Sequence, residues 1–454
     1  MFPQRLRRSS PQASLLRSCV LLALCLTPLR LFASSGCTVK SNDYFGWKAE
    51  KISNHWVELT IVPQLGGRLM QVHFGEHDFL FVSDQLKGKV IPPDPLSHAW
   101  NNYGGDKIWP MPEGSDDEQH WPGAEGSLLD SAPYKLDVLS QGPTCAIRLT
   151  GPSDPFTGQQ YIREISLGED SPIISFHAVM KNTGGYPRSW SEQSVSQYNT
   201  ASVDDTSKIN PHLWGIAAAN PSSEYLNGYH VRTGMAGNST YSVEDNLFKV
   251  HPAKANGSGE VWIDSHEGWL AVADGASGYT MIERVRYQPQ AKYPDKASMI
   301  FYVNAPRQHH AGDEENEHPE VLYMEAEVNS PIVELAPGES YAMDTQWFPT
   351  RGGEALKAVT FGGIVETPLQ ATASASGTLL TGQFGSFYEG VLMAHFYGSG
   401  GNPLGISKLE NLNPLEQIHL NTSIHPPAET RRISIHVVDQ AGIDRGPLGE
   451  AMIK

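Results

Sequence analysis

Two glutamates separated by one residue give the sequence its clearest potential for acid–base chemistry. The segment that carries them reads Tyr323-Met-Glu325-Ala-Glu327-Val-Asn-Ser-Pro331. Alternate side chains of a β-strand point to the same face, so Glu325 and Glu327 would lie side by side. Two partly buried carboxyl groups this close raise the pKa of at least one of them, which suits general acid–base catalysis. The alternative is the exposed face of a solvated strand.

A second cluster of reactive side chains lies in residues 100–110, Trp-Asn-Asn-Tyr-Gly-Gly-Asp-Lys-Ile-Trp-Pro. Aromatic faces can cover the C–H side of a pyranose ring, while charged groups make the strongest hydrogen bonds to its hydroxyls. The segment therefore predicts a sugar-binding loop with these candidate residues: Asn102, Tyr103, Asp106, Lys107 and Trp109. An ordered surface loop without a ligand is the alternative.

Residues 309–320 contain the side chains that best suit a metal ion. Oxygen ligands for Ca²⁺ would come from Asp313, Glu314, Glu315, Glu317 and Glu320, but their spacing matches no EF-hand loop. His309, His310 and His318 could bind Zn²⁺, but they lack the helical spacing of an HExxH motif. We expect no metal and no cofactor.

Strands are the elements that must position these groups. Runs with the pattern of strands occupy residues 56–62, 69–74, 144–149, 161–167, 173–181, 260–263, 269–272, 279–284, 298–303 and 321–328. A Gly66-Gly67 turn joins the first two runs and ends in Arg68, a further candidate for binding substrate. Residues 83–135 show little strand pattern, but their five tryptophans and tyrosines indicate an ordered loop region.

The composition excludes several classes of function. The 454-residue chain has 50 acidic and 33 basic residues, for a formal charge of −17. Nucleic acids and anionic membranes attract basic surfaces, so neither is an expected partner. Gly (43) and Pro (32) are frequent enough to indicate many turns but not disorder. These features favour a β-rich globular protein.

Residues 1–35 have the pattern of a secretory signal. Arginines precede an apolar run from Cys19 to Leu29, and small residues follow at positions 33–35. Cleavage near Ser35 would remove five arginines and no acids, which changes the formal charge to −22. Cys37 and Cys145 would remain, and in an exported chain two cysteines favour one disulfide. A lipid anchor at Cys37 is the alternative.

The mature chain divides into two expected domains, residues 36–352 and 358–454. Short strands at 379–384, 390–397, 417–420 and 432–438, separated by glycine turns, are typical of a small immunoglobulin-like β-sandwich. The fold class is therefore all-β, with a larger β-domain followed by a smaller one.

The motifs of the larger domain together resemble galactose-mutarotase-like proteins. The Pro-x-x-Gly-Gly-Arg turn (63–68) and the Gly-Gly-x-x-x-Trp-Pro segment (104–110) resemble the N-terminal part of that superfamily; hexose-6-phosphate epimerases have a similar segment one residue longer. Residues 173–184 resemble the strand and turn before its active-site strand, and residues 325–340 resemble its catalytic-glutamate strand and the following Pro-Gly-Glu turn. In its Asn-Tyr-Gly-Gly-Asp-Lys-x-Trp-Pro motif the chain is similar to a secreted bacterial branch.

The resemblance implies a β-supersandwich with a concave sugar-binding face. In family epimerases a glutamate base takes the proton from the anomeric hydroxyl and a histidine acid protonates the ring oxygen, without a cofactor. By motif position the base would be Glu325 or Glu327. Residues 189–194 depart from the family because they contain no histidine. Glu192 or Lys107 would have to supply the proton, and Gln193 could bind the sugar but cannot donate a proton at neutral pH.

Three functions remain open from the sequence. The favoured one is an exported carbohydrate-binding protein that uses its concave face. The first alternative is an aldose 1-epimerase-type isomerase, in which Asn102, Asp106, Trp109 and Gln193 hold the sugar. The second alternative is a polysaccharide-active enzyme, although such enzymes usually add a helical domain, for which the sequence shows no helices.

Overall fold

The protein is described from a computed structural model. It covers residues 36–97, 99–114, 119–234, 239–306, 321–375 and 377–454. The predicted signal segment and the acid- and histidine-rich residues 307–320 lie outside these ranges. None of the helices in the described ranges is long and apolar enough to cross a membrane.

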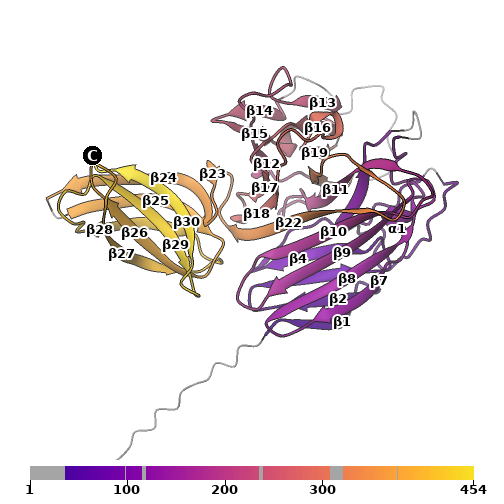
Figure 1. Ribbon diagram of the computed structural model, residues 1–454, viewed down its shortest axis with the longest axis horizontal. Helices are drawn as coiled ribbons and strands as arrows, with labels where there is room; N and C mark the ends of the chain where they lie inside the picture. Colours follow the sequence, from indigo (N-terminus) through magenta and orange to yellow (C-terminus); the bar gives the residue numbers. More distant parts are fainter. Residues whose placement is uncertain (1–35, 98, 115–118, 235–238, 307–320, 376) are drawn as a thin grey trace, which may run out of the picture. The chain divides into compact units, whose positions relative to one another are not determined.

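A twelve-stranded antiparallel sheet forms the first layer (Figure 1). In spatial order its main path is β1 (Thr38–Tyr44), β2 (Trp47–Ser53), β3 (Val57–Val62), β4 (Arg68–Phe74), β6 (Asp106–Met111), β11 (Arg188–Asn199), β20 (Tyr323–Asn329), β19 (Met299–Asn304), β16 (Gly259–Ile263) and β13 (His230–Thr233). Two short strands pair beside this path, β5 (His77–Asp78) with β4 and β21 (Val333–Leu335) with β11.

A ten-stranded antiparallel sheet forms the second layer. Its spatial order is β14 (Tyr241–Glu244), β15 (Leu247–Val250), β12 (Leu213–Ala218), β17 (Trp269–Asp274), β18 (Tyr279–Val285), β22 (Ser340–Arg351), β10 (Ile174–Asn182), β9 (Gln159–Gly168), β8 (Thr144–Ser153) and β7 (Lys135–Ser140). In β9 every second residue is buried, as expected for a strand with one face on a core. One hydrophobic cluster takes residues from both sheets, so the two layers share a core.

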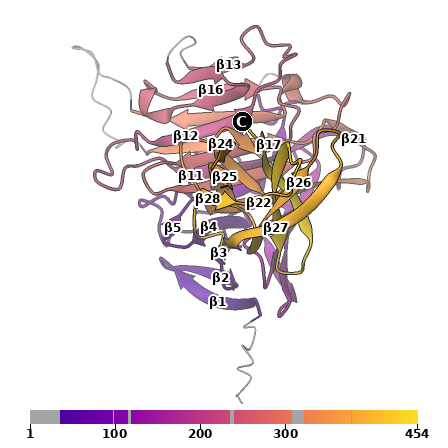
Figure 2. The same ribbon diagram turned by 90° about the vertical axis from the view of Figure 1, so that its left-hand side faces the viewer.

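The remaining strands form two four-stranded sheets (Figure 2). One contains β23 (Ala358–Val359), β24 (Gly363–Ser374), β25 (Gly377–Ser386) and β28 (Ile418–Ile424). The other contains β27 (Pro403–Leu412), β26 (Gly390–Tyr397), β29 (Arg432–Asp439) and β30 (Asp444–Met452). A separate hydrophobic cluster fills the space between them.

In the part of the chain that the structure describes, helices are few and short: α1 (Leu128–Ser131) and the 3₁₀ turns η1 (Pro252–Lys254) and η2 (Pro294–Lys296). The all-β fold class is confirmed. The last two sheets contain only strands from residue 358 onward, but residues 35–454 cluster by contacts into one unit. The division into domains at 352 and 358 stays a prediction.

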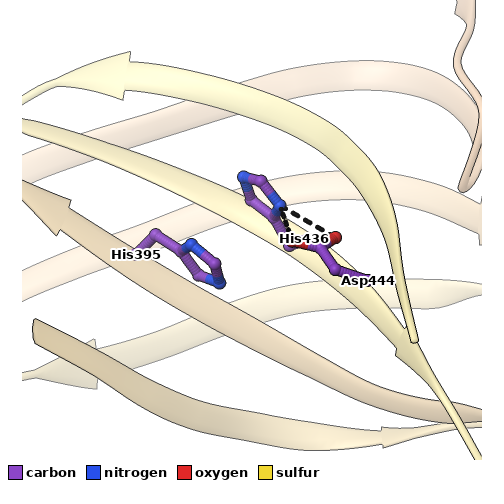
Figure 3. Close-up of side chains that lie close together, drawn as sticks. All are labelled: His395, His436 and Asp444. Carbon is purple, nitrogen blue, oxygen red and sulfur yellow. Dashed lines mark hydrogen bonds and ion pairs between the residues drawn. The ribbon is translucent and has the colours of Figure 1, made fainter. Parts of the chain in front are cut away.

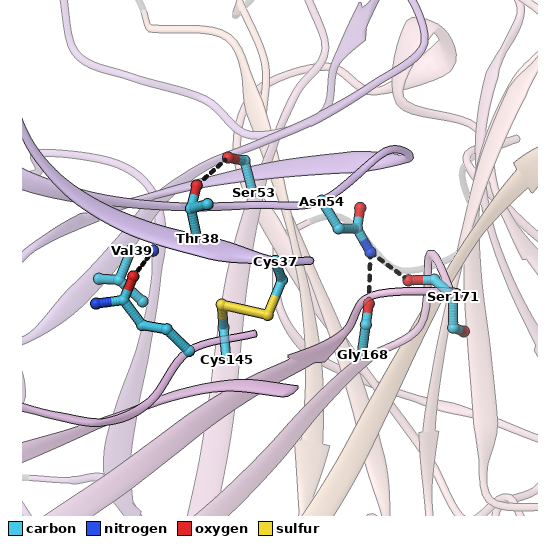
Figure 4. The surroundings of a disulfide bond; sticks show 9 residues. Cys37, Thr38, Val39, Ser53, Asn54, Cys145, Gly168 and Ser171 are labelled. Carbon is cyan, nitrogen blue, oxygen red and sulfur yellow. Dashed lines mark hydrogen bonds between the residues drawn. A yellow bond between two sulfur atoms is a disulfide. The ribbon is translucent and has the colours of Figure 1, made fainter. Parts of the chain in front are cut away.

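Cys37 and Cys145 form a disulfide that ties the two large sheets together (Figure 4). Cys37 precedes β1 of the first sheet, whereas Cys145 lies in β8 of the second, 108 residues later. Close by, the Asn54 side chain donates hydrogen bonds to the carbonyls of Gly168 and Ser171, at 2.6 and 2.7 Å. The Cys37 sulfur is therefore engaged with Cys145 and is not free for a lipid thioether.

Candidate functional site

A pocket of about 340 Å³ opens on one face of the twelve-stranded sheet, over its central strands. Its walls combine aromatic rings with carboxyl groups. The lining residues are Trp100, Trp109, Met111, Glu113, Ala124, Glu125, Gln193, Arg232, Thr233, Glu260, Trp262, Tyr302, Tyr323, Glu325 and Glu327.

Glu325 and Glu327 lie on the same face of β20 and both line the pocket, as the alternation of side chains predicts. Each is buried, with 6% of its surface exposed. They differ in their partners, because a cation stands beside Glu325 and an amide beside Glu327. The sequence does not distinguish the roles of the two glutamates, whereas their different partners do.

Glu325 forms a buried ion pair with Lys107. The Lys107 Nζ lies 3.1 Å from Glu325 Oε1, and the Gln197 amide donates to the same oxygen at 2.8 Å. Burial lowers the pKa of Lys107, and the Glu325 carboxylate opposes that shift. Both bonds use Oε1, and among the residues that the structure describes none donates to Oε2, which is therefore suited to accept from a ligand hydroxyl. Lys107 lies beneath Glu325 and is not among the lining residues.

Glu327 is held toward its protonated form. Gln193 donates a hydrogen bond to its Oε2. Burial raises the pKa of Glu327 well above its usual value, and the neighbouring Glu325 and Glu260 carboxyls raise it further. Two like charges on one buried strand face cannot both be accommodated, so the pair favours one charged and one neutral carboxyl group.

Three more glutamates line the pocket: Glu113, Glu125 and Glu260. Burial raises the pKa of Glu113 to about 7, with further contributions from the Glu260, Glu325 and Glu125 carboxyls. Burial also raises the pKa of Glu260. Arg232 supplies the positive charge in the wall, and its guanidinium lies 5.1 Å from the centre of the Trp262 ring. A carboxyl group that titrates near neutrality is suited to donate or accept a proton.

Arg68 and Asp130 hold the tryptophans of the pocket in place. They form a fully buried ion pair at 2.7 Å. Asp130 also accepts hydrogen bonds from the indole N–H groups of Trp109 and Trp100, at 3.1 and 3.3 Å. Since Arg68 is not a lining residue, it acts as a positioning residue rather than the substrate ligand that the sequence suggests.

Gly104 and Gly105 allow the backbone to pass close to neighbouring strands just before β6 begins. Gly104 has φ of +91°, and a Cβ there would lie 2.1 Å from the carbonyl oxygen of Phe81. Gly105 has φ of +71°, and its Cβ would lie 2.7 Å from the carbonyl oxygen of Leu69. Only glycine fits such close backbone approaches with positive φ. The backbone conformation of Gly104 and Gly105 thereby sets which side chains of β6, from Asp106 and Lys107 onward, point to each face of the sheet.

Besides Lys107 and Arg68, four more candidate residues from the sequence do not line the pocket. Glu192 and Asp106 are fully buried and point from β11 and β6 to the opposite face of the sheet, because strand alternation separates them from Gln193 and Lys107. Tyr103 packs edge-on against Trp47 in a separate cluster. Asn102 lies behind the wall, where its side chain caps the Gly104 N–H and hydrogen-bonds Tyr323. Glu192 therefore cannot act as the acid.

The structure adds residues that the sequence reasoning missed. The main ones are Glu113, Arg232, Glu260, Trp262, Tyr302 and Tyr323. Tyr323 could have been found, since it precedes Glu325 and Glu327 at the same spacing of two. Glu113 lies two residues after β6. Arg232, Glu260, Trp262 and Tyr302 depend on which strands are neighbours, because β13, β16 and β19 join β20 in an order that the sequence does not reveal.

A larger cavity of about 700 Å³ adjoins the pocket. The two share Glu113, Arg232 and Trp262 as lining residues. Stacked rings of His266, Tyr287 and Tyr293 line the larger cavity. The space beside the glutamates thus continues along the surface.

Within the described ranges, the glutamates of this pocket do not form a cluster close enough to share a metal ion; the one group of that kind lies in the C-terminal sheets. The sequence-based candidates for Ca²⁺ and Zn²⁺ ligands, residues 309–320, lie outside the described ranges.

Comparison with known proteins gives similarity of structure but not of sequence. No protein-family model and no curated protein matches the chain. Similar solved structures include a galactose mutarotase-like protein from Lactobacillus casei, with 9% identity, 66% of this chain and 99% of that chain covered, and a TM-score of 0.43. A putative aldose 1-epimerase from Klebsiella pneumoniae shows 13% identity, with 70% and 84% covered and a TM-score of 0.44.

A TPR-domain containing protein from Parabacteroides distasonis is also similar, with 15% identity and a TM-score of 0.43. The match covers 67% of this chain but only 47% of that one, so this chain spans about half the length of the Parabacteroides protein. Mutarotase-like proteins are also the group that the sequence motifs resemble. At such low identities the function has to be argued from the pocket itself.

Proposed function

We propose that the protein binds a carbohydrate in the pocket on the twelve-stranded sheet. The observation that carries the proposal is one cavity that combines aromatic rings with carboxyl groups. Trp262, Tyr302 and Tyr323 offer faces for the apolar side of a sugar ring, and Glu325 Oε2 offers a charge-assisted acceptor for a hydroxyl. Such a mixture suits a ligand that is polar at its edge and apolar on its face.

The adjoining cavity extends the proposal from a single sugar to a short oligosaccharide. The two cavities meet at Glu113, Arg232 and Trp262. An oligosaccharide could therefore extend from one cavity into the other while staying in contact with the protein. The stack formed by His266, Tyr287 and Tyr293 would then pack against a second sugar ring. Linear oligosaccharides should accordingly bind more tightly than the monosaccharides from which they are built.

A glycan array followed by calorimetry with the glycans that bind tests this proposal. Tyr302→Ala removes an aromatic wall and should weaken binding at least about 10-fold, equivalent to about 1.4 kcal/mol. Tyr341→Ala is the matched control, because Tyr341 is also a partly buried tyrosine but lies in β22 of the other sheet. Equal binding by both variants, or binding of no glycan by the wild type, would contradict the proposal.

A second candidate is interconversion of sugar anomers, which the unequal glutamates of the pocket favour. In this reaction Glu325 Oε2 removes the proton of the anomeric hydroxyl while Glu113 or Glu327, in its protonated form, donates a proton to the ring oxygen. The bond between the anomeric carbon and the ring oxygen breaks, the open aldehyde rotates, and the reverse steps close the ring. The proton taken by the base is matched by the proton given by the acid.

The equilibration of pure α-anomers, followed by NMR, tests this second candidate. With Glu113 as the acid, the rate should fall above about pH 7, where its carboxyl loses the proton. Glu113→Gln should then abolish the acceleration without preventing sugar binding. Glu334→Gln is a suitable control, because this exposed glutamate lies in β21, outside the pocket. A wild type that accelerates no common sugar would leave binding alone as the function.

We also propose that the chain is exported and that residues 1–35 are removed. The basic, apolar and small-residue parts of this segment support export, as does the disulfide between Cys37 and Cys145, since disulfides persist in oxidising compartments. N-terminal sequencing of the protein from its native host should find a chain that begins near Gly36. An intact Met1 terminus in the cytoplasm would overturn this proposal.

A further inference from the structure

Three potential metal ligands gather far from the pocket in sequence, on one sheet near the C-terminus (Figure 3). They are His395 in β26, His436 in β29 and Asp444 at the start of β30. One donor atom from each of them lies within 4.8 Å of those of the other two.

The strand register explains why they meet. β29 is paired with β26 on one side and β30 on the other. His395 lies opposite Ser434, so His436, two residues further on, is its diagonal neighbour on the same face. In both strands the histidines alternate with core residues such as Ala394 and Ile435, so the two rings point away from the core. The three ligand side chains are therefore positioned by paired strands and not by a loop.

The contacts among the three show a partly organised ligand set. His436 Nδ1 lies 2.9 and 3.0 Å from the two carboxylate oxygens of Asp444. The Gly446 N–H donates to Asp444 Oδ1 at 2.8 Å and so orients the carboxylate, as outer partners of metal ligands commonly do. The rings of His395 and His436 are stacked, 4.0 Å apart and 4° from parallel.

We propose that His395, His436 and Asp444 bind a zinc ion that clamps three strands of the C-terminal sheet. Two imidazole nitrogens and one carboxylate oxygen are ligands that Zn²⁺ accepts, with a water molecule as the fourth. Ca²⁺ and Mg²⁺ prefer oxygen ligands and fit this set less well.

Binding requires the three side chains to rotate toward a common point. Zinc lies about 2.0–2.2 Å from nitrogen and oxygen ligands, so the three donor atoms must move closer together than they are now. Parallel rings cannot both aim a lone pair at one ion, so at least one ring turns out of the stack. The ion has access, because the side chains of His436 and Asp444 keep 15% and 45% of their surface exposed.

Calorimetric titration of the full mature chain with ZnCl₂ tests the site, with His395→Ala, Asp444→Asn and His419→Ala as variants. His419 is the matched control, since it lies in β28 of the same pair of sheets and contacts Gln383 instead. Wild type and His419→Ala should bind one more zinc ion than His395→Ala. Asp444→Asn, the milder change, should weaken that site at least about 10-fold, a loss typical even of an outer partner.

NMR of the histidine rings gives a second readout that does not depend on folding of the alanine variant. Zinc should shift the ring resonances of both His395 and His436 in the wild type and raise its Tm. The proposal is overturned if these resonances do not change, or if His395→Ala and Asp444→Asn, when folded, bind as many zinc ions as tightly as the wild type. In that case the bound zinc would belong to histidines elsewhere in the chain, because replacing His395 or Asp444 would not remove it.

Discussion

The central strands β6, β11 and β20 together carry buried charged groups on both faces of their sheet, and the pocket opens on one of these faces. On the open face, Lys107, Glu325 and Glu327 lie under or along the pocket. On the sealed face, between the two large sheets, Asp106 forms an ion pair with Arg163. Neighbouring residues on one strand thus differ entirely in what they can do.

The sealed face is a polar network inside the core. Asp106 accepts hydrogen bonds from Ser194 and Ser196, both at 3.2 Å, while Arg163 reaches it from β9. Close by, the Tyr198 hydroxyl donates to Glu283 at 2.6 Å. These groups link β6 and β11 of one sheet to β9 and β18 of the other.

The comparison shows that a raised pKa does not by itself locate a functional site. Burial raises the pKa of Glu192 on the sealed face as it raises that of Glu327 on the open face. Both shifts come first from the loss of water around the carboxyl group. What distinguishes Glu327 is the cavity beside it and the neighbours, Glu325 and Glu260, that a ligand would also touch.

The largest effect is expected from breaking the ion pair of the sealed face. Arg163→Met leaves the buried Asp106 without its cation and should lower the free energy of unfolding by about 3–5 kcal/mol. Urea unfolding measures it. Arg148→Met is the control, because Arg148 in β8 and Glu164 in β9 form an exposed pair, worth about 0–1 kcal/mol. Similar losses in both variants would show that the sealed face does not depend on its ion pair.

A pH-dependent effect, smaller within any one pH unit, is expected from Glu283. Burial raises its pKa in the folded protein from 4.5 to about 8. Between these two values the unfolded chain releases a proton that the folded protein retains, so stability falls as the pH rises. Full stability is present below about pH 4.5 and is lost progressively toward pH 8, at up to about 1.4 kcal/mol per pH unit.

Glu283→Gln should remove this contribution, since the amide oxygen can still accept the Tyr198 hydrogen bond. The difference in unfolding free energy between variant and wild type should therefore grow in favour of the variant from pH 5 to pH 8. Chemical denaturation at several pH values measures it. A difference that stays constant with pH would mean that Glu283 is not held in its protonated form.

The two faces also explain what the sequence could and could not predict. Strands with one apolar face, such as β8, β9 and β10, follow the expected alternation and were predicted. β6 and β11 were missed as alternating runs, because nearly every residue in them is buried and both faces carry polar groups. The spacing of Glu325 and Glu327 correctly placed them on one face.

The same alternation places Glu192 and Gln193 on opposite faces of the sheet. This prediction requires knowing that residues 188–199 form one strand. Pairing between distant strands is a further limit, since β16 and β13 reach the pocket only through β19 and β20. Glu260 and Trp262 could therefore not be linked to Glu325 from local patterns. The sequence is thus informative about faces of a strand and uninformative about the order of strands.

The smallest change in stability, and the sharpest contrast between the faces, is expected from one substitution made on each. Glu192→Gln and Glu327→Gln both replace a carboxyl group that burial favours in its neutral form, so near pH 5 each should alter the unfolding free energy by about 1 kcal/mol or less. Sugar binding and anomer equilibration should respond only to Glu327→Gln, because Glu192 faces the core and has no access to the pocket. Parallel calorimetry and NMR on the two variants measure this contrast. If Glu192→Gln impaired the sugar assays as much as Glu327→Gln while folding normally, the sealed face would be part of the site, and the distinction between the two faces would fail.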